Sequence, residues 1–251
     1  MRVKTSVFLA QVWTEVFSSL FSFSKNGTDI QRMDTAIITC KTLEEELTLA
    51  MKNTGLEYPV EYIESGLHER PKKLAEAVQE RFSEVKADRV LLCIGQCGNS
   101  LIGLSAGHFE LIMPKVDDCL SLLIGSTQKK TRLSMEDRAF FLTKGWLKGE
   151  STIMSQYQRS VEKYGEDIAI SILESMYAHY KTVGLIDTGT SPIDELWDST
   201  EEVANLLGFE RRVYKGTISY IEQLLTGPWD DGKFIVKKPH ETITADDYQG
   251  M

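Results

Sequence analysis

Residues 89–100 read Arg-Val-Leu-Leu-Cys-Ile-Gly-Gln-Cys-Gly-Asn-Ser, an apolar run that ends in a glycine-containing loop. A run that is apolar at every position is typical of a strand buried on both faces of a parallel sheet. Glycine allows the chain to turn sharply after such a strand. The stretch therefore predicts a central parallel strand over residues 89–94 and a loop over residues 95–103 that opens a helix.

The same alternation of a short β-prone run and a helical pattern continues on both sides of this stretch. Further strands are expected over residues 35–40, 58–63, 109–113, 183–187, 209–214 and 234–236. Such alternation predicts an α/β fold, a mainly parallel, Rossmann-like sheet with helices on both faces. Residues 134–181 are mostly helical in pattern and are expected to form a helical insert. One mixed sheet is the simpler arrangement, and two half-domains facing each other are the alternative.

One α/β domain is expected over residues 34–243, with a short segment at each end. Residues 1–33 are expected to be an N-terminal extension, either helical or disordered. Their apolar stretch resembles a signal peptide, but Gln11, Thr14 and Glu15 interrupt it and make it too polar to span a membrane. Residues 244–251 are polar and are expected to form a loose tail.

The charge and the cysteine content narrow the class of protein. The chain has 28 Lys and Arg against 37 Asp and Glu, a net charge of −9. Such an acidic chain is a poor binder of nucleic acids and of anionic membranes, so we expect a small-molecule ligand or a protein partner. Four cysteines in 251 residues are too few for a disulfide scaffold, which favours a cytoplasmic protein with free thiols.

Four residues that can bind metals fall at the carboxyl ends of the expected strands. Cys40 and His68 follow the first two strands, and Cys97 and Cys119 follow the next two. Because these ends share one edge of a parallel sheet, where ligands bind, the four side chains are expected to form a metal site. Three thiolates and one imidazole suit zinc or an iron–sulfur cluster. Cys93 lies inside an apolar run and is expected to serve packing.

The same edge also permits catalysis without a metal. Asp118 is a natural N-cap, so Cys119 stands at a helix start, which favours a nucleophilic thiolate. The neighbouring carboxylates work against this effect. His68 would then be the catalytic base. Gly95, Gly98 and Asn99 form the cofactor-binding loop in this interpretation, with the amides of the last two as an anion hole.

Several short motifs resemble the bacterial and archaeal family called domain of unknown function 1638. They are Cys40 with the acidic helix after it, Gly66-Leu-His-Glu-Arg-Pro71, Gly95-Gln-Cys-Gly-Asn99, Asp118-Cys119, Leu142-Thr-Lys-Gly-Trp146 and Tyr164-Gly165. The resemblance implies that Cys40, His68, Cys97 and Cys119 are the family's site. Cys93 stands where the family has glycine. The resemblance also implies an association with corrinoid-dependent methyl-transfer systems, but no assigned activity.

Three functions remain open from the sequence. The leading hypothesis is a metal-binding protein that catalyses thiol or methyl transfer on a small molecule. The first alternative is a metal-free enzyme with Cys119 as nucleophile. The second is a non-catalytic accessory or carrier protein for a corrinoid methyltransferase system or another metal enzyme. Whether the chain is an enzyme is left open by these patterns.

Overall fold

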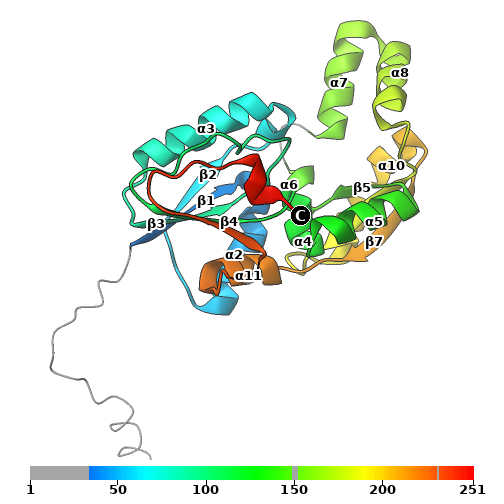
Figure 1. The fold of residues 1–251 in the computed structure, drawn as a ribbon. Coiled ribbons are helices and arrows are strands. Elements are labelled where there is room, and N and C mark those ends of the chain that lie inside the picture. The colour runs from blue at the N-terminus through cyan, green and yellow to red at the C-terminus, as the bar shows by residue number, and fades with distance from the viewer. Residues whose placement is uncertain (1–33, 149–151, 231) are drawn as a thin grey trace, which may run out of the picture. The chain divides into compact units, whose positions relative to one another are not determined.

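The computed structural model describes residues 34–148, 152–230 and 232–251, and the expectation for residues 1–33 lies outside them. The fold is α/β, as predicted, with helices around mainly parallel strands (Figure 1). The larger sheet has five strands in the order β2 (Val60–Ile63), β1 (Thr35–Cys40), β3 (Arg89–Cys93), β4 (Glu110–Pro114) and β8 (Phe234–Lys237). Only β8 is antiparallel to its neighbour.

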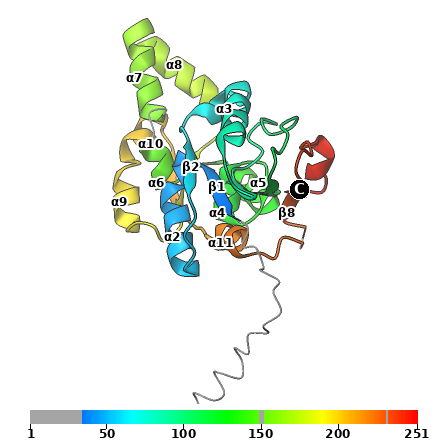
Figure 2. The ribbon, with the colours of Figure 1, turned by 90° about the vertical axis from the view of Figure 1, so that its left-hand side faces the viewer.

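The strands of this sheet are paired so that their carboxyl ends meet at one edge. Thr39 in β1 is opposite Cys93 in β3, and Cys40 is opposite Ile63 in β2. The helices α2 (Glu44–Thr54) and α11 (Ser219–Thr226) cover one face, and α3 (Pro71–Glu84) covers the other (Figures 1 and 2). The chain passes from β1 to β2 on one side and then to β3 on the other, which creates a switch point between β1 and β3.

The second sheet contains three parallel strands in the order β5, β6 and β7. The prediction of one mixed sheet is therefore wrong. β5 (Ala139–Leu142) lies inside the segment expected to be a helical insert, and β6 (Thr182–Asp187) and β7 (Glu210–Lys215) follow it. β5 could not be predicted from the sequence, because a run of only four apolar residues has the same pattern in a strand and in a buried helix.

The remaining helices lie between these strands or after the last of them. They are η1 (Lys41–Leu43), η2 (Leu67–Glu69), α4 (Cys119–Ile124), α5 (Thr127–Asp137), α6 (Lys144–Leu147), α7 (Ile153–Tyr164), α8 (Glu166–Tyr177), α9 (Ile193–Asp198), α10 (Glu201–Leu207) and η3 (Ala245–Tyr248). Among the described residues, no helix combines the length and the apolar character needed to cross a membrane.

The described residues form two hydrophobic cores, and alternate residues of β6 pack into each of them. Val183 and Leu185 are fully buried against the second core, formed with α8, α9 and α10. Ile186, together with Phe141 and Tyr214 from the neighbouring strands, joins the core of the five-stranded sheet. Because successive side chains of a strand point to opposite faces, β6 packs against both cores and so connects the two sheets.

Two local expectations were wrong. The loop over residues 95–103 opens no helix, because Cys97, Gly98 and Asn99 have φ angles of 44°, 68° and 66°. This left-handed conformation does not extend into a right-handed helix. The tail over residues 244–251 is not loose: Thr244 and Asp247 form a capping box, and Lys237 pairs with Asp247 at 2.7 Å.

Candidate functional site

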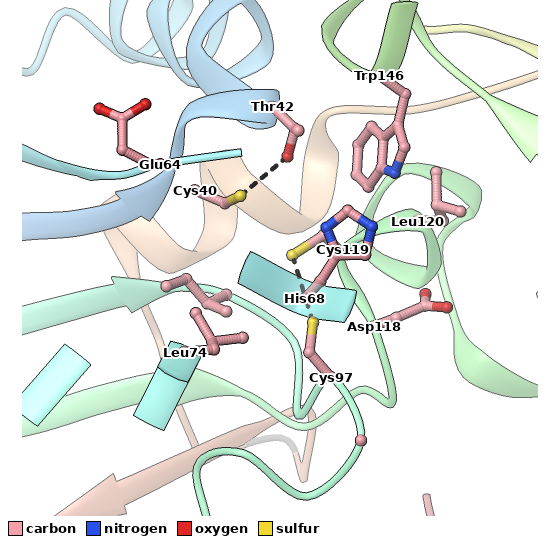
Figure 3. Close-up of a pocket in the computed structure, with 12 residues that line it drawn as sticks. Cys40, Thr42, Glu64, His68, Leu74, Cys97, Asp118, Cys119, Leu120 and Trp146 are labelled. Carbon is pink, nitrogen blue, oxygen red and sulfur yellow. Dashed lines mark hydrogen bonds between the residues drawn. The ribbon is translucent and has the colours of Figure 1, made fainter. Parts of the chain in front are cut away.

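The four residues at the strand ends line one cavity of about 220 Å³ (Figure 3). Cys40 ends β1, His68 lies in η2 after β2, Cys97 follows β3, and Cys119 begins α4 after β4. The cavity therefore lies at the switch point between β1 and β3, the usual ligand position in open α/β sheets. The structure brings together the four side chains that the sequence placed at this edge.

Two of the thiols lie within contact distance of each other. The Sγ atoms of Cys97 and Cys119 are 4.0 Å apart. The backbone N–H of Gly95 donates to Cys119 Sγ at 3.4 Å. Cys119 is 4% exposed, whereas Cys97 is half-buried in its loop. The pair thus combines one thiol near the surface with one deep thiol.

Backbone hydrogen bonds hold the segments of these two cysteines side by side. Gln96 N donates to Val116 O at 3.0 Å, and Cys97 N donates to Asp117 O at 2.7 Å. A Cβ atom on Gly95 would overlap the backbone of Asp118, so the two segments approach this closely only with glycine at position 95. The role of Gly95 is therefore close packing of the loop against the start of α4.

The loop itself is held in an unusual backbone conformation. Three successive residues, Cys97, Gly98 and Asn99, are left-handed, and only the middle one is glycine. Non-glycine residues adopt this region seldom, at a cost of about 1 kcal/mol or more each. Gly98 lines the cavity, but Asn99 is exposed and does not. Of the expected cofactor-binding residues, only Gly98 therefore contacts the cavity.

The opposite wall is formed by Cys40 and α6. Thr42 Oγ1 donates a hydrogen bond of 3.1 Å to Cys40 Sγ. A Cβ atom on Gly145 would overlap the carbonyl oxygen of Thr42, so glycine is needed where α6 crosses this turn. This close approach places Trp146 in the cavity wall, with its ring centroid 6.4 Å from that of His68.

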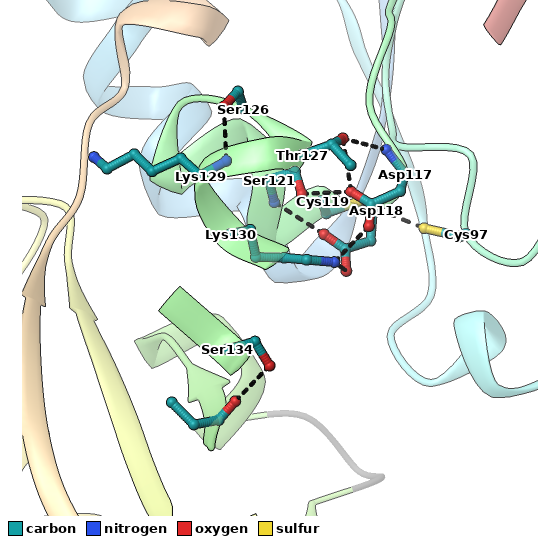
Figure 4. A network of polar contacts seen from close by, with 11 residues as sticks. Cys97, Asp117, Asp118, Cys119, Ser121, Ser126, Thr127, Lys129, Lys130 and Ser134 are labelled. Carbon is teal, nitrogen blue, oxygen red and sulfur yellow. Dashed lines mark hydrogen bonds and ion pairs between the residues drawn. The ribbon is translucent and has the colours of Figure 1, made fainter. Parts of the chain in front are cut away.

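A charged network surrounds the start of α4 (Figure 4). Lys130 Nζ lies 2.6 Å from a carboxylate oxygen of both Asp117 and Asp118. Asp118 Oδ1 accepts the backbone N–H of Ser121 at 2.9 Å, as the expected N-cap of α4. Thr127 Oγ1 donates to Asp117 Oδ1 at 2.9 Å. Lys130 thus balances the two carboxylates that precede Cys119.

The thiols of the site have altered acidity. The contact with Cys97 and burial raise the pKa of Cys119 well above its ordinary value, and the Gly95 N–H only partly opposes them. Burial likewise raises the pKa of Cys40. Cys93 is fully buried, and burial raises its pKa to about 12, which agrees with a packing role. The expected effect of the helix start, a lowered Cys119 pKa, is therefore overcome by burial and by Cys97.

The site is only partly arranged for a metal. Among the described residues, no group of three or more His, Cys, Asp or Glu side chains is positioned to hold a metal ion. Two sulfur atoms bound to one tetrahedral zinc are about 3.8 Å apart, given zinc–sulfur bonds of about 2.3 Å. The Cys97–Cys119 separation of 4.0 Å fits two such ligands. Cys40 and His68 line the same cavity.

Sequence patterns missed several residues in or near the site. Thr42 donates a hydrogen bond to Cys40, and Trp146 and Glu64 line the cavity. Tyr248 is 5% exposed, its hydroxyl has no hydrogen-bond partner in the described part of the chain, and burial, Asp247 and Cys97 raise its pKa. The position of Tyr248 depends on how the tail folds back, which no local pattern contains.

No hydrogen bond joins the His68 imidazole to the Cys119 thiol among the described residues. A catalytic base needs to be within hydrogen-bond reach of the proton that it removes. The geometry thus gives less support to the nucleophile–base pair than to the pair of thiols.

The comparisons with known proteins identify a family and no relative of known activity. A family model described as "Protein of unknown function (DUF1638)" matches residues 62–225, more than half of the chain. The matched segment contains His68, Cys97 and Cys119, and Cys40 precedes it. Neither the curated proteins nor the solved structures gave a match.

Proposed function

Since the chain belongs to the DUF1638 family, whose description assigns no activity, we propose from the site alone that it binds a metal through thiolates. The ligands are Cys97, Cys119 and Cys40, with His68 as the fourth ligand or as a partner of the ligands. The metal is zinc or the iron of an iron–sulfur cluster. The observation that carries the proposal is the placement of three thiols and an imidazole around one cavity, with two sulfur atoms 4.0 Å apart.

The surroundings of the thiols support this assignment. Burial raises the pKa of Cys40, and the contact with Cys97 together with burial raises that of Cys119, which disfavours the thiolate form in the absence of a cation. A bound cation removes this obstacle, since a coordinating thiol is deprotonated outright. The N–H of Gly95 and the hydroxyl of Thr42 already donate to two of the sulfur atoms. Such donors stabilise the negative charge that metal ligation requires.

The cavity is suited to a small, partly apolar molecule. Leu74, Leu120 and Trp146 contribute apolar side chains to its wall, and Glu64 stands at an exposed position on its rim. A bound zinc would act as a Lewis acid that lowers the pKa of a bound thiol or water. The apolar wall would exclude water from the bound molecule. Thiol or methyl transfer is the reaction class that we propose, and its link to corrinoid systems rests on the family resemblance.

The test is the metal content of the full chain purified without oxygen. We expect zinc, or iron with acid-labile sulfide and a thiolate-to-iron absorbance, in stoichiometric amount. The double variant Cys97→Ser/Cys119→Ser is expected to lose this metal, and the matched control Cys93→Ala to keep it. Metal-free wild-type protein with four titratable thiols, or equal metal in wild type and double variant, contradicts the proposal.

A further inference from the structure

We propose that Cys97 and Cys119 form a redox-active pair that closes to a disulfide by exchange with a small disulfide molecule. The proposal rests on the geometry of the pair and needs no metal. It adds a thiol–disulfide exchange activity to the site. The substrate class is a low-molecular-weight disulfide that fits the cavity of about 220 Å³.

The distance between the sulfur atoms is the first argument. They are 4.0 Å apart as thiols, and a disulfide bond of about 2.05 Å requires them to approach by only about 2 Å. The backbones are already fixed side by side by the hydrogen bonds from Gln96 and Cys97 to residues 116 and 117. Closure therefore needs side-chain rotation and a small loop shift, and no rearrangement of the sheet.

The unequal exposure of the two thiols is the second argument. Cys97 is half-buried on a loop whose next residues, Gly98 and Asn99, are exposed, so a small disulfide can reach it from solvent. Cys119 is 4% exposed and lies behind it. This order is that of an attacking thiol at the surface and a resolving thiol beneath it.

The other two cysteines are poorly placed for this reaction. Cys93 is fully buried at the end of β3. Cys40 is 8% exposed, and its sulfur accepts the hydrogen bond from Thr42. Cys97 and Cys119 are the cysteine pair joined by a sulfur–sulfur contact in the described part of the chain.

The exchange balances in two steps. The Cys97 thiolate attacks one sulfur of the small disulfide RSSR, which forms a mixed disulfide and releases RS⁻. The Cys119 thiolate then attacks the Cys97 sulfur, which forms the protein disulfide and releases the second RS⁻. The two protons lost by the protein thiols appear on the two released RSH molecules. The protein pair is oxidised by two electrons, and RSSR is reduced by two.

Oxidation would also control the occupancy of the site. Two sulfur atoms in a disulfide no longer offer the thiolates that a metal needs. The oxidised pair and a bound metal therefore exclude each other. This consequence, unlike the disulfide itself, depends on the proposed metal site.

The experiment uses the reduced full chain, as purified and after treatment with a chelator, and bis(2-hydroxyethyl) disulfide as the probe. Chelator-treated wild type is expected to lose two hydrogen atoms in mass, with a tryptic link between the peptides of Cys97 and Cys119. Cys119→Ser should stop at a mixed disulfide on Cys97. Cys97→Ser should react more slowly by a factor of about ten or more. The control Cys93→Ala should behave as wild type.

The outcomes separate this proposal from the metal site. A stable mixed disulfide in wild type, or a link that involves Cys40 or Cys93, overturns the redox pair whatever the metal content. Protein that carries no metal but forms the Cys97–Cys119 link supports the redox pair and overturns the metal site alone. Release of metal as the link forms supports both.

Discussion

The five-stranded and three-stranded sheets are built alike but carry different side chains at the ends of their strands. In the larger sheet, Cys40 ends β1. The loops or helices that follow β2, β3 and β4 contain His68, Cys97 and Cys119, respectively. In the smaller sheet, β5, β6 and β7 are followed by Thr143, Thr188 and Gly216. The same parallel architecture thus carries cysteine and histidine side chains at the strand ends of one sheet only.

The smaller sheet still contributes to the cavity. The helix α6 follows β5 directly and places Trp146 against His68. Ion pairs from Lys144 and Lys148 to Glu45, at 3.2 Å and 2.6 Å, connect α6 and the residue after it to the start of α2. One sheet therefore supplies the cysteine and histidine side chains, and the other supplies a wall of the cavity and holds this wall in place.

The largest expected effect comes from adding one methyl group at Gly95, in the loop after β3. In Gly95→Ala the new Cβ overlaps the Asp118 backbone, which is fixed by the cap of α4. We expect the free energy of unfolding, measured in urea, to fall by about 3 kcal/mol. The two cysteine segments should also separate, so the disulfide between Cys97 and Cys119 should form more slowly.

Gly184→Ala is the matched change in the smaller sheet. Its Cβ would stand 2.7 Å from the Phe141 ring and 3.0 Å from the Tyr214 ring, and side-chain rings can shift more easily than backbone. We expect a loss of about 1 kcal/mol and unchanged disulfide formation. Equal slowing of disulfide formation in both variants would show that Gly95 has no special role at the site.

A second test compares the charged groups beside the two sheets. Lys130 is 15% exposed and bridges Asp117 and Asp118, so Lys130→Met leaves two partly buried carboxylates without their cation. We expect the free energy of unfolding to fall by about 2 kcal/mol in urea denaturation. The control is Arg212→Met beside the smaller sheet, where the cation that pairs with Asp137 is 50% exposed and a smaller loss is expected. An equal or larger loss in the control would contradict this ranking.

The strands of the larger sheet could be predicted from the sequence more readily than the first strand of the smaller sheet. Strand β3 is apolar at nearly every position, and this pattern alone indicated a buried parallel strand. Since carboxyl ends of parallel strands share an edge, Cys40, His68, Cys97 and Cys119 could be placed together without a structure. The strand β5 has four residues between helices, too few for its pattern to differ from that of a helix.

The remaining errors concern contacts between distant segments. The helix expected to open from the loop over residues 95–103 fails because three successive residues are left-handed, and of these only Gly98 and, more weakly, Asn99 signal this conformation in the sequence. The ordered tail depends on Lys237 and Thr244 meeting Asp247, and on the burial of Tyr248. Trp146 reaches the cavity through the close approach of Gly145 to Thr42, which only the tertiary structure shows.

The smallest expected effect concerns a buried carboxyl that joins the two sheets. Glu46 in α2 is 1% exposed, accepts a hydrogen bond of 2.9 Å from Thr188 after β6, and leaves its second oxygen unpartnered among the described residues. Burial raises its pKa above the ordinary value of 4.5, with Glu45 adding to the shift and Thr188 and Lys144 opposing it.

A raised carboxyl pKa means that the folded protein keeps a proton that the unfolded chain has released. The contribution of Glu46 to the free energy of unfolding of wild type should therefore fall as the pH rises from about 4.5 through the raised pKa of Glu46. Glu46→Gln removes this titration and keeps an acceptor for Thr188, so its stability relative to wild type should grow with pH over that window. Urea denaturation from pH 4 to 8 measures the difference, and a difference that stays constant or shrinks with pH would mean that Glu46 is ionised where the two sheets meet.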